Sequence, residues 1–367
     1  MSVNIIPKLK VFFSEYREPL LIFFISRLLV GAVVFFAVGY GFGSATLAQW
    51  DARSYLKIAE DGYTFSGSYL AEGSFIAFFP LLPLLIKGVS IISGLSIYFS
   101  ALLLNFLLGL AAACLLYALA RDWKDRETAR GAVFLLSFFP TAVFLTSPYT
   151  ESLFLVLAVG ALLLIRKKFF AGASMMVALA LVTRLTGILL LPILLYELIQ
   201  AKRKFIVILV LLVLSVVPLG MFLHYQYTQY GTPLAFMEAQ KTNWHHEAVW
   251  PWVGVTNLWG YVAQDGSLAY MWRSDFFFLM LMVLTLVLSS RRLPIAWLFF
   301  GWGVVFLTII QSYILGTSRY MLLVLPFYFF WGHVLARRPL ALQLVVAVSA
   351  SWMVFNTLLF ILSKSIY

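Results

Sequence analysis

Residues 20–63 read LLIFFISRLLVGAVVFFAVGYGFGSATLAQWDARSYLKIAEDGY, and this stretch decides what kind of fold the chain can adopt. Its first part, Leu20–Tyr40, is apolar and has the roughly 20 residues that a helix needs to cross a bilayer. Its second part, Gln49–Tyr63, is polar and places the carboxylate of Asp51 just past that helix. The stretch therefore predicts a membrane helix followed by an acidic, amphipathic segment at the membrane surface.

The composition of the whole chain extends this prediction. Of the 367 residues, 63% are hydrophobic and 11% are charged, and the mean hydropathy is +0.96. Soluble domains carry roughly 25% charged residues, so we expect an all-α polytopic membrane protein. The apolar runs lack the period-two alternation of a β-barrel. The net charge of +11 lies in short basic clusters between apolar runs, which is typical of cytoplasmic loops and predicts no nucleic-acid partner.

Hydropathy predicts about twelve helices, several of them short, in a single domain over residues 1–367. The candidates are Leu20–Tyr40, Phe75–Ser93, Ile97–Leu119, Gly131–Ser147, Glu151–Ile165, Phe169–Val182, Leu185–Ile199, Phe205–Leu223, Phe276–Ser289, Pro294–Leu315, Tyr320–Leu335 and Leu340–Leu362.

The basic clusters predict which loops lie on the outer side of the membrane. With the clusters at 121–130, 166–168, 202–204, 291–292 and 337–338 in the cytoplasm, the loops at 41–74, 147–151, 224–275 and 316–319 lie outside, as does Arg184. Two full crossings between residues 74 and 121 would break this rule. Either 75–93, which contains Pro80 and Pro83, is a re-entrant segment, or the cluster at 121–130 is an exception.

The short helices predict a cavity. A run such as Phe169–Val182 reaches only about 20 Å, against a hydrocarbon core of roughly 30 Å. Polar backbone at that depth is tolerated only where it lines a cavity inside the protein. We therefore expect a cavity on the outer face, with the loops 41–74 and 224–275 forming the roof of an active site.

Asp51 is the first candidate catalytic residue, as a general base or an acid that orients the substrate. A solvated loop acid or a helix N-cap is the alternative role for it. A helix that begins at Asp51 places Tyr55 one turn on, on the same face, and ends at Gly62 as a C-cap glycine would end it. Tyr55 and Trp50, which precedes Asp51, are candidates to support a substrate. Glu60 and Asp61 form an acidic pair at the unfavourable end of that helix. They either contact the substrate, with one of them sharing the role of base, or lie in a solvated turn.

Two arginines are candidates for binding phosphate, because guanidinium groups match phosphate oxygens and stay charged. Arg184 lies between two short helices, and its alternative role is an ion pair with Glu151. Arg319 precedes a helix on the outer side, and its alternative role is an interface anchor. Tyr149 and Glu151 belong to a turn of hydroxyl and acidic side chains that we expect at the cavity.

Lys241 and His245 lie in an aromatic loop and are candidates for contacting a sugar or lipid headgroup, with membrane-interface residues as the alternative. No metal site is expected, because adjacent histidines do not face one way on a helix and no ligand follows at a suitable spacing. The sequence contains no P-loop, G-x-G-x-x-G, G-x-S-x-G or D-x-D motif. A transferase would therefore take a lipid-borne donor and need no cofactor.

These residues resemble the PIG-V-type mannosyltransferases, a branch of the GT-C superfamily of glycosyltransferases. The resemblance is specific over roughly the first half of the chain and rests on Trp50-Asp51, Tyr55, Ile58-Ala59, Gly62-Tyr63, Phe78–Pro83, Asn105, Phe139–Phe144, Ser147–Ser152 and Thr183–Gly187, with Ser318–Tyr320 in the second half.

The resemblance implies a GT-C-like helix bundle and an inverting transfer of mannose from polyprenyl-phosphate-mannose, with Asp51 at the position of the catalytic acid of the first outer loop. The acceptor would be a glycolipid, glycan or protein. The short chain favours a prokaryotic member in the plasma membrane, with its active site on the outer face, which corresponds to the lumenal side of the endoplasmic reticulum. A lipid-linked sugar transporter or flippase is the alternative function, since cavities with intramembrane arginines also suit transport.

Overall fold

The computed structural model describes residues 14–43, 46–63, 75–266, 268–314 and 316–363. Within these residues the chain is helical, with the α-helices α2 (Arg17–Gly39), α3 (Asp51–Asp61), α4 (Leu81–Ser93), α5 (Ile97–Trp123), α6 (Arg126–Ser137), α7 (Glu151–Arg166), α8 (Phe170–Leu181), α9 (Leu190–Gln200), α10 (Phe205–Tyr230), α11 (Ala235–Trp244), α12 (Pro251–Val262), α13 (Ala269–Ser289), α14 (Ile295–Ile309), α15 (Thr317–Met321), α16 (Leu325–Ala336) and α17 (Pro339–Ile361). Three short 3-10 helices, η1 (Phe75–Ala77), η2 (Ala142–Leu145) and η3 (Leu185–Leu189), join some of them.

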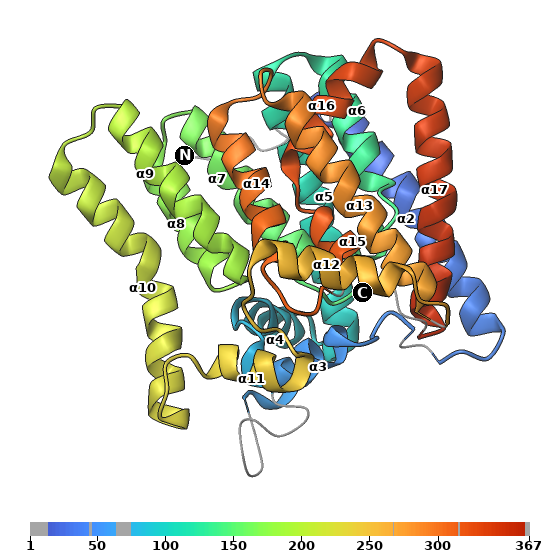
Figure 1. The fold of residues 1–367 in the computed structure, drawn as a ribbon, viewed down its shortest axis with the longest axis horizontal. Helices are drawn as coiled ribbons and strands as arrows, with labels where there is room; N and C mark the ends of the chain where they lie inside the picture. Colours follow the sequence, from blue (N-terminus) through green and yellow to red (C-terminus); the bar gives the residue numbers. More distant parts are fainter. Residues whose placement is uncertain (1–13, 44–45, 64–74, 267, 315, 364–367) are drawn as a thin grey trace.

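The polytopic membrane class is confirmed. Five helices, α2, α5, α10, α13 and α17, are long and apolar enough to cross a membrane, and several shorter apolar helices pack among them. Figure 1 shows the turns α5–α6, α7–α8, α9–α10, α13–α14 and α16–α17 at one end of the bundle, and α3, α4 and α11 at the opposite end. The turns that carry the predicted basic clusters therefore gather at a single end.

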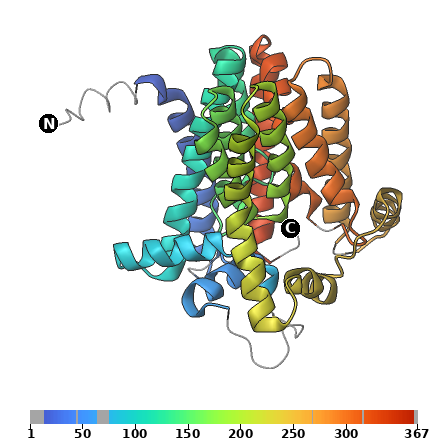
Figure 2. The ribbon, with the colours of Figure 1, turned by 90° about the vertical axis from the view of Figure 1, so that its left-hand side faces the viewer.

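The segment 75–93 does not form the continuous helix that its hydropathy predicts. Its helix begins only after Pro80, and α4 lies across the long axis of the bundle (Figure 2). Proline has no N–H to donate to a carbonyl of the preceding turn, so it interrupts a helix, but it is tolerated where a new helix begins. Because α4 does not cross, α5 carries the chain from the end that holds α3 to the end that holds the other basic turns. The conflict over the cluster at 121–130 disappears.

Other predicted boundaries also need correction. Gly131–Ser147 is not one helix, because α6 ends at Ser137 and the chain continues through η2. The predicted loop 224–275 is shorter, since α10 continues to Tyr230 and α13 begins at Ala269. Two helices, α11 and α12, occupy what remains of it. Part of the other predicted loop, 64–74, lies outside the described residues.

Arg27 shows how the bundle tolerates a charge in α2. Its side chain is buried and donates to the carbonyl oxygens of Ala142 (2.6 Å) and Ser137 (2.8 Å) and to Thr146 Oγ1 (2.9 Å). Both carbonyls lie where the chain leaves α6 and enters η2. Arg27 is therefore a structural residue that ties α2 to this irregular turn, and it does not reach out to the interface.

Candidate functional site

A pocket of about 290 Å³ lies at the end of the bundle that holds α3 and α11. Its walls come from α3, the segment after η1, the turn before α7, the turn between α8 and η3, α11, α14 and α15. Short helices α7, α8 and α14 stop at this level, which leaves room that a full-length span would fill. The predicted site residues Asp51, Tyr55, Tyr149, Arg184 and Arg319 all line this pocket.

Helix α3 presents Asp51 to the pocket. The helix begins at Asp51 itself and ends at Gly62, whose positive φ of 78° and N–H bond to Ile58 stop it as expected. Trp50 occupies the N-cap position, so the N-cap role considered for Asp51 is wrong. Tyr55 lies one turn on and packs edge-to-face against Phe78 (5.0 Å between ring centroids).

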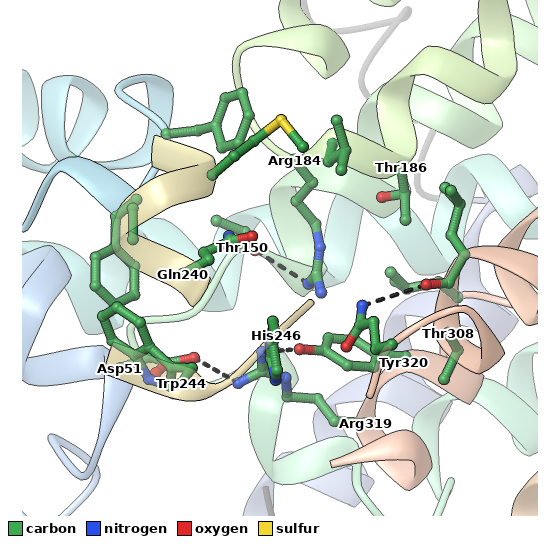
Figure 3. Close-up of a pocket in the computed structure, with 18 of the residues that line it drawn as sticks. Asp51, Thr150, Arg184, Thr186, Gln240, Trp244, His246, Thr308, Arg319 and Tyr320 are labelled. Carbon is green, nitrogen blue, oxygen red and sulfur yellow. Dashed lines mark hydrogen bonds and ion pairs between the residues drawn. The ribbon is translucent and has the colours of Figure 1, made fainter. Parts of the chain in front are cut away.

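The carboxylate of Asp51 meets Arg319 in an ion pair of 2.8 Å between Oδ2 and Nη1. Arg319 is buried and its Nε lies 3.2 Å from Glu151 Oε1. The same Glu151 oxygen accepts from Arg184 Nη1 at 2.5 Å. The four side chains thus form one line of alternating charge, Asp51, Arg319, Glu151 and Arg184. Figure 3 shows its two ends, the Asp51–Arg319 ion pair and Arg184 beside Thr150.

Glu151 is the centre of this line. Its side chain is completely buried, and one of its oxygens holds both guanidinium groups. A buried carboxylate is strongly stabilised by such partners and would be costly without them. Its second oxygen, Oε2, has no hydrogen-bond partner among the described residues. The two arginines are therefore held close together, with guanidinium N–H groups left for a ligand in the pocket.

Aromatic rings surround the arginines. The guanidinium of Arg319 lies 5.1 Å from the ring centroid of Tyr149 and 5.0 Å from that of Tyr320, which is within cation–π range. Tyr149 is buried and donates to the backbone oxygen of Gln49 (3.0 Å), which ties the turn before α7 to the approach to α3. Burial, reinforced by the Asp51 carboxylate, raises the pKa of Tyr55, so its phenol stays protonated.

The turn that carries Arg184 is kept close to α8 by a glycine. A Cβ at Gly187 would lie 2.5 Å from the backbone oxygen of Ala180, so any other residue would push η3 away. Arg184 also donates to Thr150 Oγ1 (3.1 Å). The ion pair with Glu151 that the sequence left open is therefore present in the structure.

Asp275 is a buried acid that the sequence analysis missed. It lies in α13 and accepts from the backbone N–H groups of Gly316 (3.0 Å) and Ser318 (2.7 Å), at the start of α15. These are the orphan donors at a helix N-terminus that a side chain normally caps from within its own segment. Asp275 in α13 therefore fixes the start of α15. It thereby fixes the position from which the Arg319 side chain extends to Asp51.

Six of the predicted residues are absent from the pocket lining: Glu151, which is completely buried, and five exposed or partly exposed residues. Trp50 is partly exposed at the start of α3. Glu60 and Asp61 are exposed at the far end of α3, where Asp61 pairs with Lys57 and the backbone oxygen of Glu60 accepts from Lys87.

Lys241 is exposed and pairs with Glu247 (3.0 Å), and Glu247 itself lines the pocket. His245 has a positive φ of 56°, and it is the next residue, His246, that lines the pocket. The left-handed residue at the end of α11 redirects the chain, which sequence periodicity does not reveal. Among the described residues, no three His, Cys, Asp or Glu side chains gather as metal ligands would.

The chain is similar in sequence to two GPI mannosyltransferases. The chain is 30% identical over 215 residues to GPI alpha-1,6-mannosyltransferase 2 of Cricetulus griseus, covering 51% of this chain and 41% of that protein. It is 28% identical over 118 residues to GPI mannosyltransferase 2 of Drosophila melanogaster, covering 29% of this chain and 25% of the relative. The chain therefore aligns with less than half the length of each of these relatives.

Two solved membrane enzymes share the fold. ArnT from Cupriavidus metallidurans, bound to undecaprenyl phosphate, matches with a TM-score of 0.57 and 14% identity over 89% of this chain and 63% of ArnT. The archaeal oligosaccharyltransferase AglB from Archaeoglobus fulgidus, in complex with an inhibitory peptide and a dolichol-phosphate, matches with a TM-score of 0.51 and 14% identity over 97% of this chain and 56% of AglB. The predicted GT-C-like fold is confirmed. The family model Mannosyltransferase (PIG-V) matches residues 40–267, and the chain belongs to that family.

Proposed function

We propose that the protein transfers a mannosyl residue from polyprenyl-phosphate-mannose to an acceptor hydroxyl, with inversion at the anomeric carbon. The observation that carries this proposal is the line of charge from Asp51 through Arg319 and the buried Glu151 to Arg184, in which Asp51 and both arginines line one pocket. It combines a carboxylate that can take a proton with two fixed cations that can hold a phosphate. Membership of the mannosyltransferase family supports the sugar.

The two arginines are proposed to bind the donor phosphate. Guanidinium groups form strong, charge-assisted bonds with phosphate oxygens, and their charge persists at any physiological pH. Lipid phosphates bound to ArnT and AglB support a lipid-borne donor for this chain. Asp51 and Glu151 pair with these cations, and an arriving phosphate would compete with Asp51 for Arg319.

The reaction is proposed to be a single displacement. The acceptor oxygen attacks the anomeric carbon, its proton passes to a carboxylate oxygen of Asp51, and the bond from that carbon to the phosphate oxygen breaks. The electron pair leaves with polyprenyl phosphate, whose developing charge the arginines stabilise electrostatically. Attack from the side opposite the phosphate inverts the configuration. This scheme needs no metal or other cofactor.

The pocket is proposed to face the outer side of the membrane. The turns with the basic clusters lie at the opposite end of the bundle, and basic turns are retained in the cytoplasm. A prokaryotic plasma membrane is the proposed location. The acceptor is a glycolipid, glycan or protein that reaches this side.

The test is transfer from radiolabelled polyprenyl-phosphate-mannose to membrane extract by the purified protein. We expect a labelled product of inverted configuration, and we expect Asp51→Asn to lower kcat by at least about a hundredfold, since general bases contribute roughly 10²–10⁴. Asp61→Asn, an acid of the same helix outside the pocket, is the matched control. Flux of the donor across vesicles without a covalent product would favour a flippase instead, and a fully active Asp51→Asn protein would remove Asp51 from the base role.

A further inference from the structure

One face of the pocket carries no charge and has no role in the proposed displacement. It consists of Gln240 and Trp244 in α11 and of His246 just beyond it. Figure 3 shows these three side chains in the same pocket as Arg184 and Arg319, beside the Asp51–Arg319 ion pair. We call Gln240, Trp244 and His246 the neutral face.

The local backbone explains why these three residues point the same way. Gln240 and Trp244 are four residues apart, so they share one side of α11. The helix ends at Trp244, and His245 takes a left-handed conformation with φ of 56°. That turn brings the N–H of His246 to the carbonyl oxygen of Gln240 (3.3 Å) and leaves His246, not His245, lining the pocket.

The chemistry of the neutral face suits an uncharged ligand that is rich in hydroxyl groups. Trp244 is held in place by an edge-to-face contact with Phe78, at 5.5 Å between ring centroids. Burial lowers the pKa of His246 to about 4, so its imidazole is neutral at pH 7 and offers one donor and one acceptor. The Gln240 amide also offers both. Neither the Gln240 nor the His246 side chain has a hydrogen-bond partner among the described residues.

The size of the pocket limits the ligand. Pockets for small molecules range from roughly 300 to 1,000 Å³, and this one, at about 290 Å³, lies at the lower end. The donor phosphate proposed to lie beside the arginines would take part of that volume. What remains suits one sugar ring better than an oligosaccharide.

We infer that Gln240, Trp244 and His246 bind the hexosyl ring of the donor, with Trp244 covering the ring and the two polar side chains hydrogen-bonded to its hydroxyl groups. This inference rests on the proposed transfer from a polyprenyl-phosphate sugar. It divides the pocket into a charged part that holds phosphate and a neutral part that recognises the sugar. These three residues are binding residues, and the proton goes to Asp51.

The test separates recognition of the sugar from recognition of the lipid phosphate. The purified protein is assayed with a short-chain polyprenyl-phosphate-mannose as donor, and with the same polyprenyl phosphate lacking the sugar as inhibitor. For Trp244→Leu and His246→Ala we expect kcat/KM for the donor to fall about tenfold or more, the usual loss when a site forfeits a hydrogen bond or an apolar contact. The inhibition constant of bare polyprenyl phosphate should stay close to the wild-type value. His245→Asn and Trp252→Leu are the matched controls, because neither residue lines the pocket and asparagine tolerates the left-handed conformation of residue 245.

Two results would overturn the inference. One is an equal loss of affinity for the donor and for bare polyprenyl phosphate, which would mean that the neutral face shapes the whole pocket. The other is unchanged donor kinetics in both variants. A wild-type protein that transfers no sugar would instead defeat the proposed function. In that case, binding of sugar-bearing and bare lipid phosphate, followed by tryptophan fluorescence in His246→Ala and wild type, still decides whether this face binds the sugar.

Discussion

Replacement of Asp275 should move Arg319 without changing its charge, and so should test whether the position of Arg319 matters for activity. Asp275→Ala removes the acceptor of two buried N–H groups, those of Gly316 and Ser318, and leaves them without a partner at the start of α15. Each such bond contributes roughly 1–3 kcal/mol, more when the acceptor is charged, so the loss should be about 2–6 kcal/mol. Asp275→Asn keeps one acceptor oxygen and should lose about half of that.

The effect on activity follows from the geometry. Arg319 is the third residue of α15, and its ion pair with Asp51 is 2.8 Å long, so a shift of α15 moves the guanidinium away from both carboxylates. A misplacement of about 1 Å can cost about a hundredfold in rate. We therefore expect kcat/KM to fall in the order wild type, Asp275→Asn, Asp275→Ala, with the alanine variant at least about a hundredfold below wild type.

The assay pairs transfer kinetics with thermal unfolding in detergent. Asp265→Asn is the matched control, because Asp265 is an exposed acid that pairs with Arg273 at the surface, and exposed pairs contribute about 0–1 kcal/mol. If Asp275 positions Arg319, activity measured well below the unfolding temperature should fall as more hydrogen bonds from Gly316 and Ser318 to residue 275 are lost. If Asp275→Ala lowered the unfolding temperature yet kept wild-type kcat/KM below it, the residue would stabilise the fold without positioning Arg319, and the reasoning would be refuted.

Three further variants test other parts of the structure. Glu151→Gln should destabilise the protein by about 3–5 kcal/mol, as when one partner of a buried ion pair is removed, and should raise the KM of the donor; an unchanged melting curve would contradict the burial of this pair. The lowered pKa of His246 means that the unfolded chain binds that proton more readily, so stability should fall as the pH drops from 6.5 to about 4; in His246→Gln the fall should be shallower, and identical unfolding temperatures across this range would argue against the shift. Arg27→Met removes two hydrogen bonds to buried carbonyl oxygens and should lower stability by about 2–6 kcal/mol without changing the donor KM measured on the folded fraction; a selective rise in that KM would give Arg27 a role at the site.

The elements that the sequence predicted well are those set by local forces. The apolar runs of α2, α5 and α17 were placed to within a few residues, because transfer of a helix into lipid depends on its own side chains. The start of α3 at Asp51 and its end at Gly62 were also predicted, since a helix in a short segment begins and stops on local signals. The grouping of the basic turns followed from charge alone.

The same local reasoning failed where packing decides. A left-handed residue at His245 put His246 in the pocket in its place, whereas the break at Pro80 was one of the two alternatives that the sequence left open. From the sequence, Glu60 and Asp61 were candidates to share the role of base with Asp51, because all three are acids of one short polar segment. They lie two or more turns further along α3, on its exposed part, and so do not line the pocket.

The sequence by itself determined that this is a helical membrane protein with a carboxylate after its first span and arginines in its short loops. Only the tertiary structure decided which of these groups meet. Arg319 and Asp51 are 268 positions apart, and Asp275 caps a helix 41 positions away. Such pairs have no periodicity to reveal them. They exist because buried charges and orphan N–H groups need partners, and in a packed bundle those partners come from whichever helix lies beside them.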